Sequence, residues 1–173
     1  VDGFLAPEIP RSGGSYAPAL SAAHRHLTDS NCPALPVLPE GFQIIPLPGH
    51  FFDMVGFRTA DDVVYLADCL SSKETLEKYQ ISFIYDIAAY LKTLEMVKQL
   101  EAKMFVPAHA ETVENIAPLA QFNIDKVNEI ADKIIKICTE PLCFEQILQK
   151  VFAEYGLAMN FEQYVLVGST VRS

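Results

Sequence analysis

The stretch GFQIIPLPGHFFDMVGFRTADDVVYLADCL, residues 41–70, decides the fold. Its apolar residues come in short runs rich in β-branched and aromatic side chains, separated by proline, glycine or polar turns. GFQIIPLP predicts a strand that ends at Pro46 or Pro48. MVGFR and VVYLAD predict an antiparallel hairpin around the polar residues 59–62. A small β-sheet is therefore expected in this part of the chain.

Helical patterns dominate the rest of the chain. Residues 86–101 carry apolar side chains at spacings of three and four, which predicts a helix that covers one face of the sheet. Residues 104–108 predict one more buried strand. After residue 115 we expect helices at 115–138, at 144–155 and from Asn160 onward. This order predicts an α/β layer followed by a helical tail.

The first 40 residues have a different character. They hold six of the eleven prolines and the run SGGS at residues 12–15. Proline removes backbone donors and glycine adds unfolded-state entropy, so residues 1–40 are predicted to be an irregular segment. Residues 17–27 are the one place where we expect a short helix.

Composition limits the function classes. The chain of 173 residues has a net charge of −9, and its 13 Lys and Arg form no run, which disfavours nucleic acid. Its apolar runs are too short to span a bilayer. The four cysteines form no CxxC pair, so we expect them to be reduced. These features predict a cytoplasmic protein and disfavour nucleic acid and membrane as partners.

Three predicted strands end in residues that can ligate a metal. His50 follows the turn of LPGH, Asp68 ends VVYLAD, and His109 ends MFVPAH. Residues beyond the ends of short buried strands are held rigidly and remain open to solvent, which suits a binding site. Imidazole and carboxylate are ligands of zinc, and also of iron or manganese.

Each residue has an ordinary structural interpretation as well. Pro-Gly-His is a common turn, Asp68 is a candidate cap for a helix over residues 71–79, and His109 is able to bond locally. Glu111 either orients His109 or is simply exposed. Taken together, however, three ligand-type residues at strand ends in a chain with four histidines favour a metal site.

LPGH, YLAD and VPAHAE resemble the metallo-β-lactamase superfamily in order, type and strand-end position, over roughly residues 41–115. The resemblance implies half of an αββα sandwich, a short mixed sheet with a covering helix, followed by a helical extension over residues 116–173 that looks cut short. It further implies that His50 serves one metal, Asp68 bridges two, and His109 serves the other. Zinc is the expected ion, and iron or manganese is the alternative.

One family motif, HxHxDH, is absent from the sequence. The nearest string is HRHLTD, residues 24–29, in which Thr28 replaces the aspartate and Asp29 the final histidine. We interpret His24 and His26 as loop residues, with an unusual replacement site as the minority alternative. Half of a sandwich also exposes an apolar sheet face, which residues 1–40, a second copy or a separate chain would have to cover. We expect self-association or pairing with the missing N-terminal half.

The resemblance implies a metal-dependent hydrolase. In such an enzyme a metal-bound hydroxide attacks an ester, thioester, lactam or phosphoester, and Asp68 would be the catalytic residue of this chain. Because HxHxDH is absent, the active site of the chain alone is expected to be incomplete. The alternative hypothesis is a non-catalytic or degenerate half-domain that assembles with a partner chain.

Overall fold

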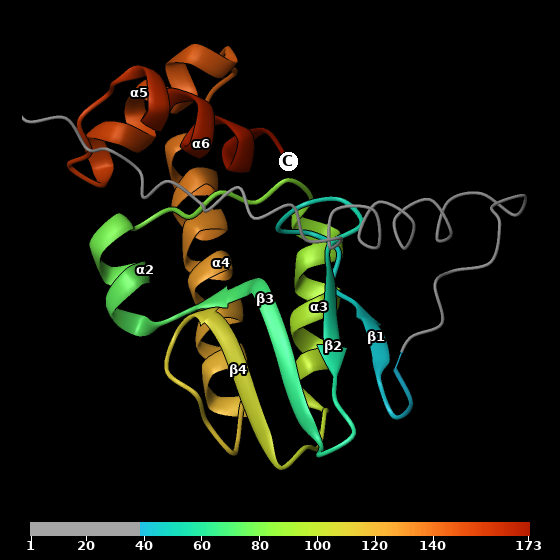
Figure 1. Cartoon of the computed structure of the whole chain (residues 1–173). Helices are drawn as coiled ribbons and strands as arrows, with labels where there is room; N and C mark the ends of the chain where they lie inside the picture. Colours follow the sequence, from blue (N-terminus) through green and yellow to red (C-terminus); the bar gives the residue numbers. More distant parts are fainter. Residues whose placement is uncertain (1–38) are drawn as a thin grey trace, which may run out of the picture. The chain divides into compact units, whose positions relative to one another are not determined.

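Four strands form one mixed sheet in the order β1-β2-β3-β4 (Figure 1). The strands are β1 (Gln43–Pro46), β2 (Val55–Arg58), β3 (Val63–Ser71) and β4 (Met104–His109). β1, β2 and β3 pair antiparallel, whereas β4 pairs parallel to β3. The predicted hairpin and the predicted strand ending at Pro46 are confirmed. The computed structural model describes residues 39–173, so the predictions for residues 1–38 lie outside the described residues.

Five helices accompany the sheet in the described part of the chain. They are α2 (Lys73–Tyr79), α3 (Ile87–Lys98), α4 (Ala117–Ile137), α5 (Phe144–Glu154) and α6 (Phe161–Arg172). α3 starts where the sequence predicts, because the Asp86 side chain accepts a hydrogen bond from the Ala89 N–H and so caps the helix. Pro118 lies in the first turn of α4, where no helical hydrogen bond is lost.

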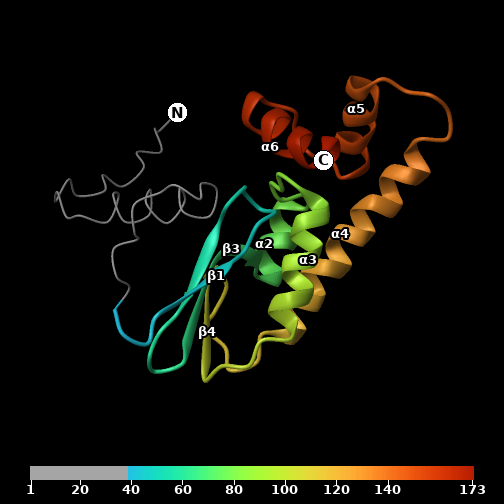
Figure 2. The same cartoon turned by 90° about the vertical axis from the view of Figure 1, so that its right-hand side faces the viewer.

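The main core lies between the sheet and two helices. Figure 2 shows α3 and α4 on one face of the sheet. Val64 and Leu66 of β3 and Phe105 of β4 point to that face and are almost completely buried. They pack in one cluster with Leu94 of α3 and with Ile124 of α4. The predicted covering helix is confirmed, and the first helix of the tail turns out to cover the sheet as well.

Side chains on the opposite face of the sheet form an apolar row. Ile44 pairs with Phe57, Phe57 with Tyr65, and Tyr65 with Val106, so the row crosses all four strands. Side chains alternate between the faces of a strand, and Tyr65 stands between the buried Val64 and Leu66. No helix of residues 39–173 covers this row, and Tyr65 is 45% exposed. We call these four residues the bare row.

The tail ends in a second, smaller core. Leu148, Val151 and Phe152 of α5 pack with Val167 of α6, and Ile130 joins them from the C-terminal half of α4. Asn160 caps α6 as predicted, since its side chain accepts a hydrogen bond from the Gln163 N–H. Among residues 39–173, no helix combines the length and hydropathy that crossing a bilayer requires.

Candidate metal centre

Asp68 lies inside β3, and the prediction that it ends its strand is wrong. The strand continues to Ser71, and its backbone makes a bulge around Ala67, which has a φ of 47°. The register with β4 shifts on both sides of Ala67, and pairing resumes between Ser71 and His109. A bulge adds a residue to one strand and redirects its side chains. Asp68 therefore has no partner residue in β4, although the strand continues beyond it.

Asp68 does not cap the helix that follows it. The helix in question is α2, and its cap is Ser72, whose hydroxyl accepts a hydrogen bond from the Thr75 N–H. The capping interpretation of Asp68 is therefore wrong. The next residue, Cys69, is fully buried, and burial raises the pKa of its thiol to about 12. Cys69 is thus a core residue, and Asp68 is the residue that faces the end of β4.

His109 is the last residue of β4 and lies beside Asp68. Its Nε2 is 3.3 Å from Asp68 Oδ1, and the two side chains are 57% and 44% exposed. Two ligands at zinc distances of ~2.1 Å and a tetrahedral angle lie roughly 3.4 Å apart, so this separation suits a pair of ligands to one ion. The Ser72 N–H donates to the His109 carbonyl over 2.9 Å, which fixes the backbone next to the pair.

His50 follows the Pro-Gly turn after β1 and lies near the same pair. The pKa of His50 is lowered, mainly by burial and in addition by the nearby His109. The Asp68 carboxylate and a hydrogen bond to the backbone of Phe83 act in the opposite direction and offset part of this effect. The Phe83 ring also meets the imidazole edge-on, with 5.5 Å between ring centroids. A lowered pKa keeps the imidazole neutral, which is the form that binds metals.

The described residues do not complete a metal site. Within residues 39–173, no three His, Cys, Asp or Glu side chains gather closely enough to hold an ion. The donors fit a divalent metal in kind, since two imidazoles and one carboxylate are a known zinc set. They do not fit in number or convergence, because His50 stays apart from the close pair of Asp68 and His109. The ligand roles of His50, Asp68 and His109 stay predictions.

Glu111 shows no sign of orienting His109. Its side chain is exposed, and within the described residues the close partner of the imidazole is Asp68. An open surface pocket of about 490 Å³ is lined by His109 together with Glu74, Thr75, Lys78 and Tyr79 of α2. This pocket gives a small molecule space next to the pair.

An aromatic cluster next to His50 was not identified from the sequence. Phe51 and Phe52 stack with 4.3 Å between ring centroids, and Tyr85 lies 5.4 Å from Phe52. All three side chains are about half exposed. Two adjacent phenylalanines directly after the predicted ligand were the available signal, because exposed aromatic side chains next to a polar site are typical of binding surfaces.

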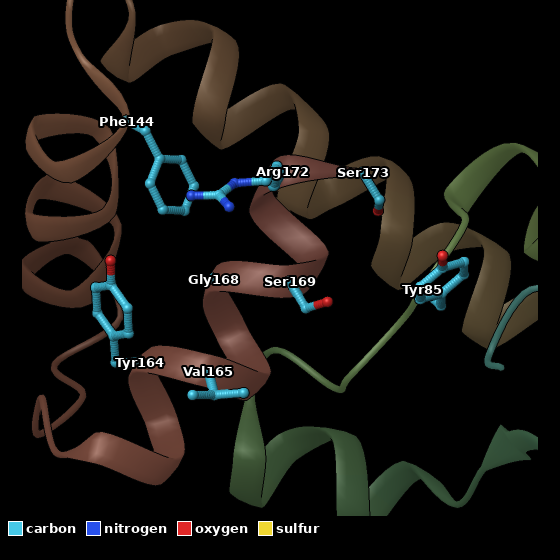
Figure 3. A pocket seen from close by; sticks show the side chains of 8 residues that line it. All are labelled: Tyr85, Phe144, Tyr164, Val165, Gly168, Ser169, Arg172 and Ser173. Atoms are coloured by element: carbon cyan, nitrogen blue, oxygen red, sulfur yellow. The ribbon is translucent and has the colours of Figure 1, made fainter.

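The cluster borders an open pocket of about 450 Å³ (Figure 3). Tyr85 forms one side of this pocket, and α6 forms the opposite side with Tyr164, Val165, Gly168, Ser169 and Arg172. The Arg172 guanidinium lies over the Phe144 ring at 4.1 Å from the centroid. The pocket is thus lined by apolar side chains and by the Arg172 cation, and it lies next to the loop that contacts His50.

Comparison with known structures places this architecture among metallo-β-lactamase folds. The chain superposes on a metallo-β-lactamase family protein from Thermus thermophilus with a TM-score of 0.56 and 13% identity, over 93% of this chain and 59% of that one. A β-lactamase domain protein from Burkholderia ambifaria gives a TM-score of 0.56 and 14% identity, over 90% of this chain and 54% of the other.

The shared feature is the fold, since the sequence identity to both proteins is low. The predicted fold class, a mixed α/β arrangement of the metallo-β-lactamase type, is confirmed. The chain spans between half and three-fifths of the length of these two structures. No family model matches the sequence, and no curated protein matches it.

Proposed function

We propose that this chain contributes half of the active site of a metal-dependent hydrolase of the metallo-β-lactamase superfamily. The observation that carries the proposal is the Asp68–His109 pair, in which Oδ1 and Nε2 lie 3.3 Å apart, with Asp68 beside the bulge of β3 and His109 at the end of the adjacent β4. His50, whose pKa is lowered by burial, would add a third donor of a kind that suits zinc, with iron or manganese as alternatives. The other donors come from a half-domain that carries HxHxDH.

The residues of this chain would have separate roles. His50, Asp68 and His109 would hold the metal, which when bound makes hydroxide available near neutral pH. The pocket beside His109 gives a substrate access to the pair, and the exposed aromatic cluster supplies an apolar surface next to His50. Ester, thioester, lactam and phosphoester substrates are all compatible with such a site.

Metal content tests the proposal directly. The chain is joined to a half-domain that carries HxHxDH, purified, dialysed and subjected to elemental analysis. We expect at least about one zinc or iron per assembled protein, and a loss of most of it in His109→Ala, because each missing ligand weakens binding strongly. Glu111→Gln is the control, and it is expected to retain the metal since Glu111 is exposed. An assembled protein without metal would contradict the proposal.

A second candidate function is favoured by the bare row and by the partial coverage of the structural neighbours. In this alternative the chain is a non-catalytic half-domain whose sheet packs on a partner. Ile44, Phe57, Tyr65 and Val106 would then be buried in the interface. Metal content and turnover of the assembled protein separate the two candidates, because only the hydrolase requires both.

Both candidates predict that the chain alone associates through the bare row. We expect Tyr65→Lys to weaken self-association at least about tenfold, because a charge would be buried on an apolar surface. Sedimentation velocity over a concentration series measures this effect. Tyr79→Lys is the matched control, since Tyr79 is 47% exposed but lies on α2. Equal effects of the two changes, or a chain that stays monomeric throughout, would contradict the prediction.

A further inference from the structure

The described residues contain three buried polar side chains, Thr93, Asn123 and Thr170. A buried polar group is costly unless it is hydrogen-bonded, so its partners show what it holds in place. All three bond to the backbone of segments far away in the sequence. Each of these segments contains, or contacts, one of the predicted metal ligands.

The first side chain holds the turn before His50. Thr93 lies in the middle of α3, and its hydroxyl donates to the Pro48 carbonyl over 2.6 Å. The turn then passes very close to the same helix at Gly49, where an added Cβ would lie 2.3 Å from the Tyr90 backbone. α3 therefore fixes the start of the turn that delivers His50.

The second side chain holds the ends of β3 and β4, next to Asp68 and His109. The Asn123 amide of α4 accepts from the Ser71 N–H over 3.0 Å and donates to the Ser71 carbonyl over 2.9 Å. These two hydrogen bonds satisfy the Ser71 N–H and carbonyl as a neighbouring strand would, and they fix the end of β3. The next residue, Ser72, donates its N–H to the His109 carbonyl, so the same contact also supports the end of β4.

The third side chain holds the loop that packs on His50. The Thr170 hydroxyl of α6 accepts from the Ile84 N–H over 2.8 Å and donates to the Ser82 carbonyl over 2.7 Å. These two bonds flank Phe83, whose ring meets the His50 imidazole edge-on. The last helix of the tail therefore reaches His50 through one loop residue.

We propose that Thr93, Asn123 and Thr170 are positioning residues through which α3, α4 and α6 hold the three segments around the candidate metal centre. The helical tail then has a function in the site, although none of its side chains belongs to the predicted ligand set. The proposal rests on the proposed function for the identity of the ligands. The contacts themselves are independent of any metal.

The test uses the full chain without metal, so that its failure is distinct from a failure of the proposed function. In Thr170→Val the hydroxyl is replaced by a methyl group of similar size. We expect hydrogen exchange of the Ile84 amide to accelerate at least about tenfold, because its hydrogen bond acceptor is lost. We also expect the imidazole nitrogen chemical shifts of His50 to change, recorded at a pH where the ring is neutral. Thr170→Ser, which keeps the hydroxyl, should restore both signals.

Val167→Ala is the matched control for destabilisation. Val167 is buried on the same helix, one turn away, and belongs to the second core. Val167→Ala should lower the free energy of unfolding. The His50 chemical shifts should stay at their wild-type values, and exchange of the Ile84 amide should accelerate no more than the loss of global stability explains. If Thr170→Val fails to fold, Thr93→Val with Thr93→Ser provides a second comparison through the His50 imidazole shifts and the carbonyl carbon shift of Pro48, which accepts the Thr93 hydrogen bond. Unchanged His50 shifts in a folded valine variant, or equal changes in Val167→Ala, would overturn the proposal.

Discussion

Asp68→Ala is expected to abolish most metal binding and to lower hydrolytic activity more than about a hundredfold in the assembled protein. Among residues 39–173, Asp68 is the carboxylate paired with the His109 imidazole, and in the proposed site it would be a metal ligand. The change should barely affect folding, because an ion pair this exposed contributes at most about 1 kcal/mol to the free energy of unfolding. The measurement is zinc per chain by elemental analysis, together with turnover of a generic thioester.

His24→Ala is the control for Asp68→Ala. His24 belongs to the HRHLTD string, which departs from the family motif at two positions, and its loss should change neither metal content nor turnover. Thermal unfolding of both variants shows whether they remain folded. If His24→Ala removes as much metal as Asp68→Ala does, the predicted site is wrong.

Gly49→Ala is expected to have the largest effect on stability, lowering the free energy of unfolding by about 3–5 kcal/mol. Gly49 has a φ of 125°, which residues with a side chain rarely adopt. An added Cβ would lie 2.3 Å from both the Cα and the N of Tyr90, so the turn and α3 would have to separate. Urea denaturation followed by circular dichroism measures the loss.

Gly156→Ala separates steric contact from backbone strain. Gly156 follows α5 with a φ of 61°, and nothing lies within 4 Å of an added Cβ. The expected loss is only about 1–2 kcal/mol, the cost of a left-handed conformation for a non-glycine residue. A loss in Gly49→Ala no greater than that in Gly156→Ala would show that the turn moves away from α3 without cost.

Local patterns predicted most of the fold. Short apolar runs bounded by proline, glycine or polar turns identified β1 to β4, and helical patterns identified α3, α4 and α5 to within a few residues. Caps such as Asp86 and Asn160 were visible because a helix start requires a polar acceptor at one position. These signals concern residues that are neighbours in sequence, so one sequence is enough to find them.

The features of the candidate site that depend on distant residues were not predictable. The bulge at Ala67 has no sequence signal, since alanine rarely adopts a positive φ and does so here within a sheet. Asn123 meets Ser71 across 52 positions and Thr170 meets Ile84 across 86. In a single sequence, nothing distinguishes these two residues from polar residues on a helix surface. A joint metal site was predicted from the ligand-type residues at the predicted strand ends, and the family resemblance supplied the separate roles of Asp68 and His109.

The parallel pairing of β3 and β4 has a consequence for how the chain acquires its site. Parallel neighbours cannot be joined by a tight turn, and here the crossover between them contains α2 and α3. Asp68 and His109 therefore become neighbours only after this whole connection has closed, a non-local step that is slow compared with hairpin formation. During synthesis the β1–β3 meander can form before β4 leaves the ribosome, whereas the ligand pair cannot. Amide protection at Ser72, which donates to the His109 carbonyl, would report the moment at which the pair forms.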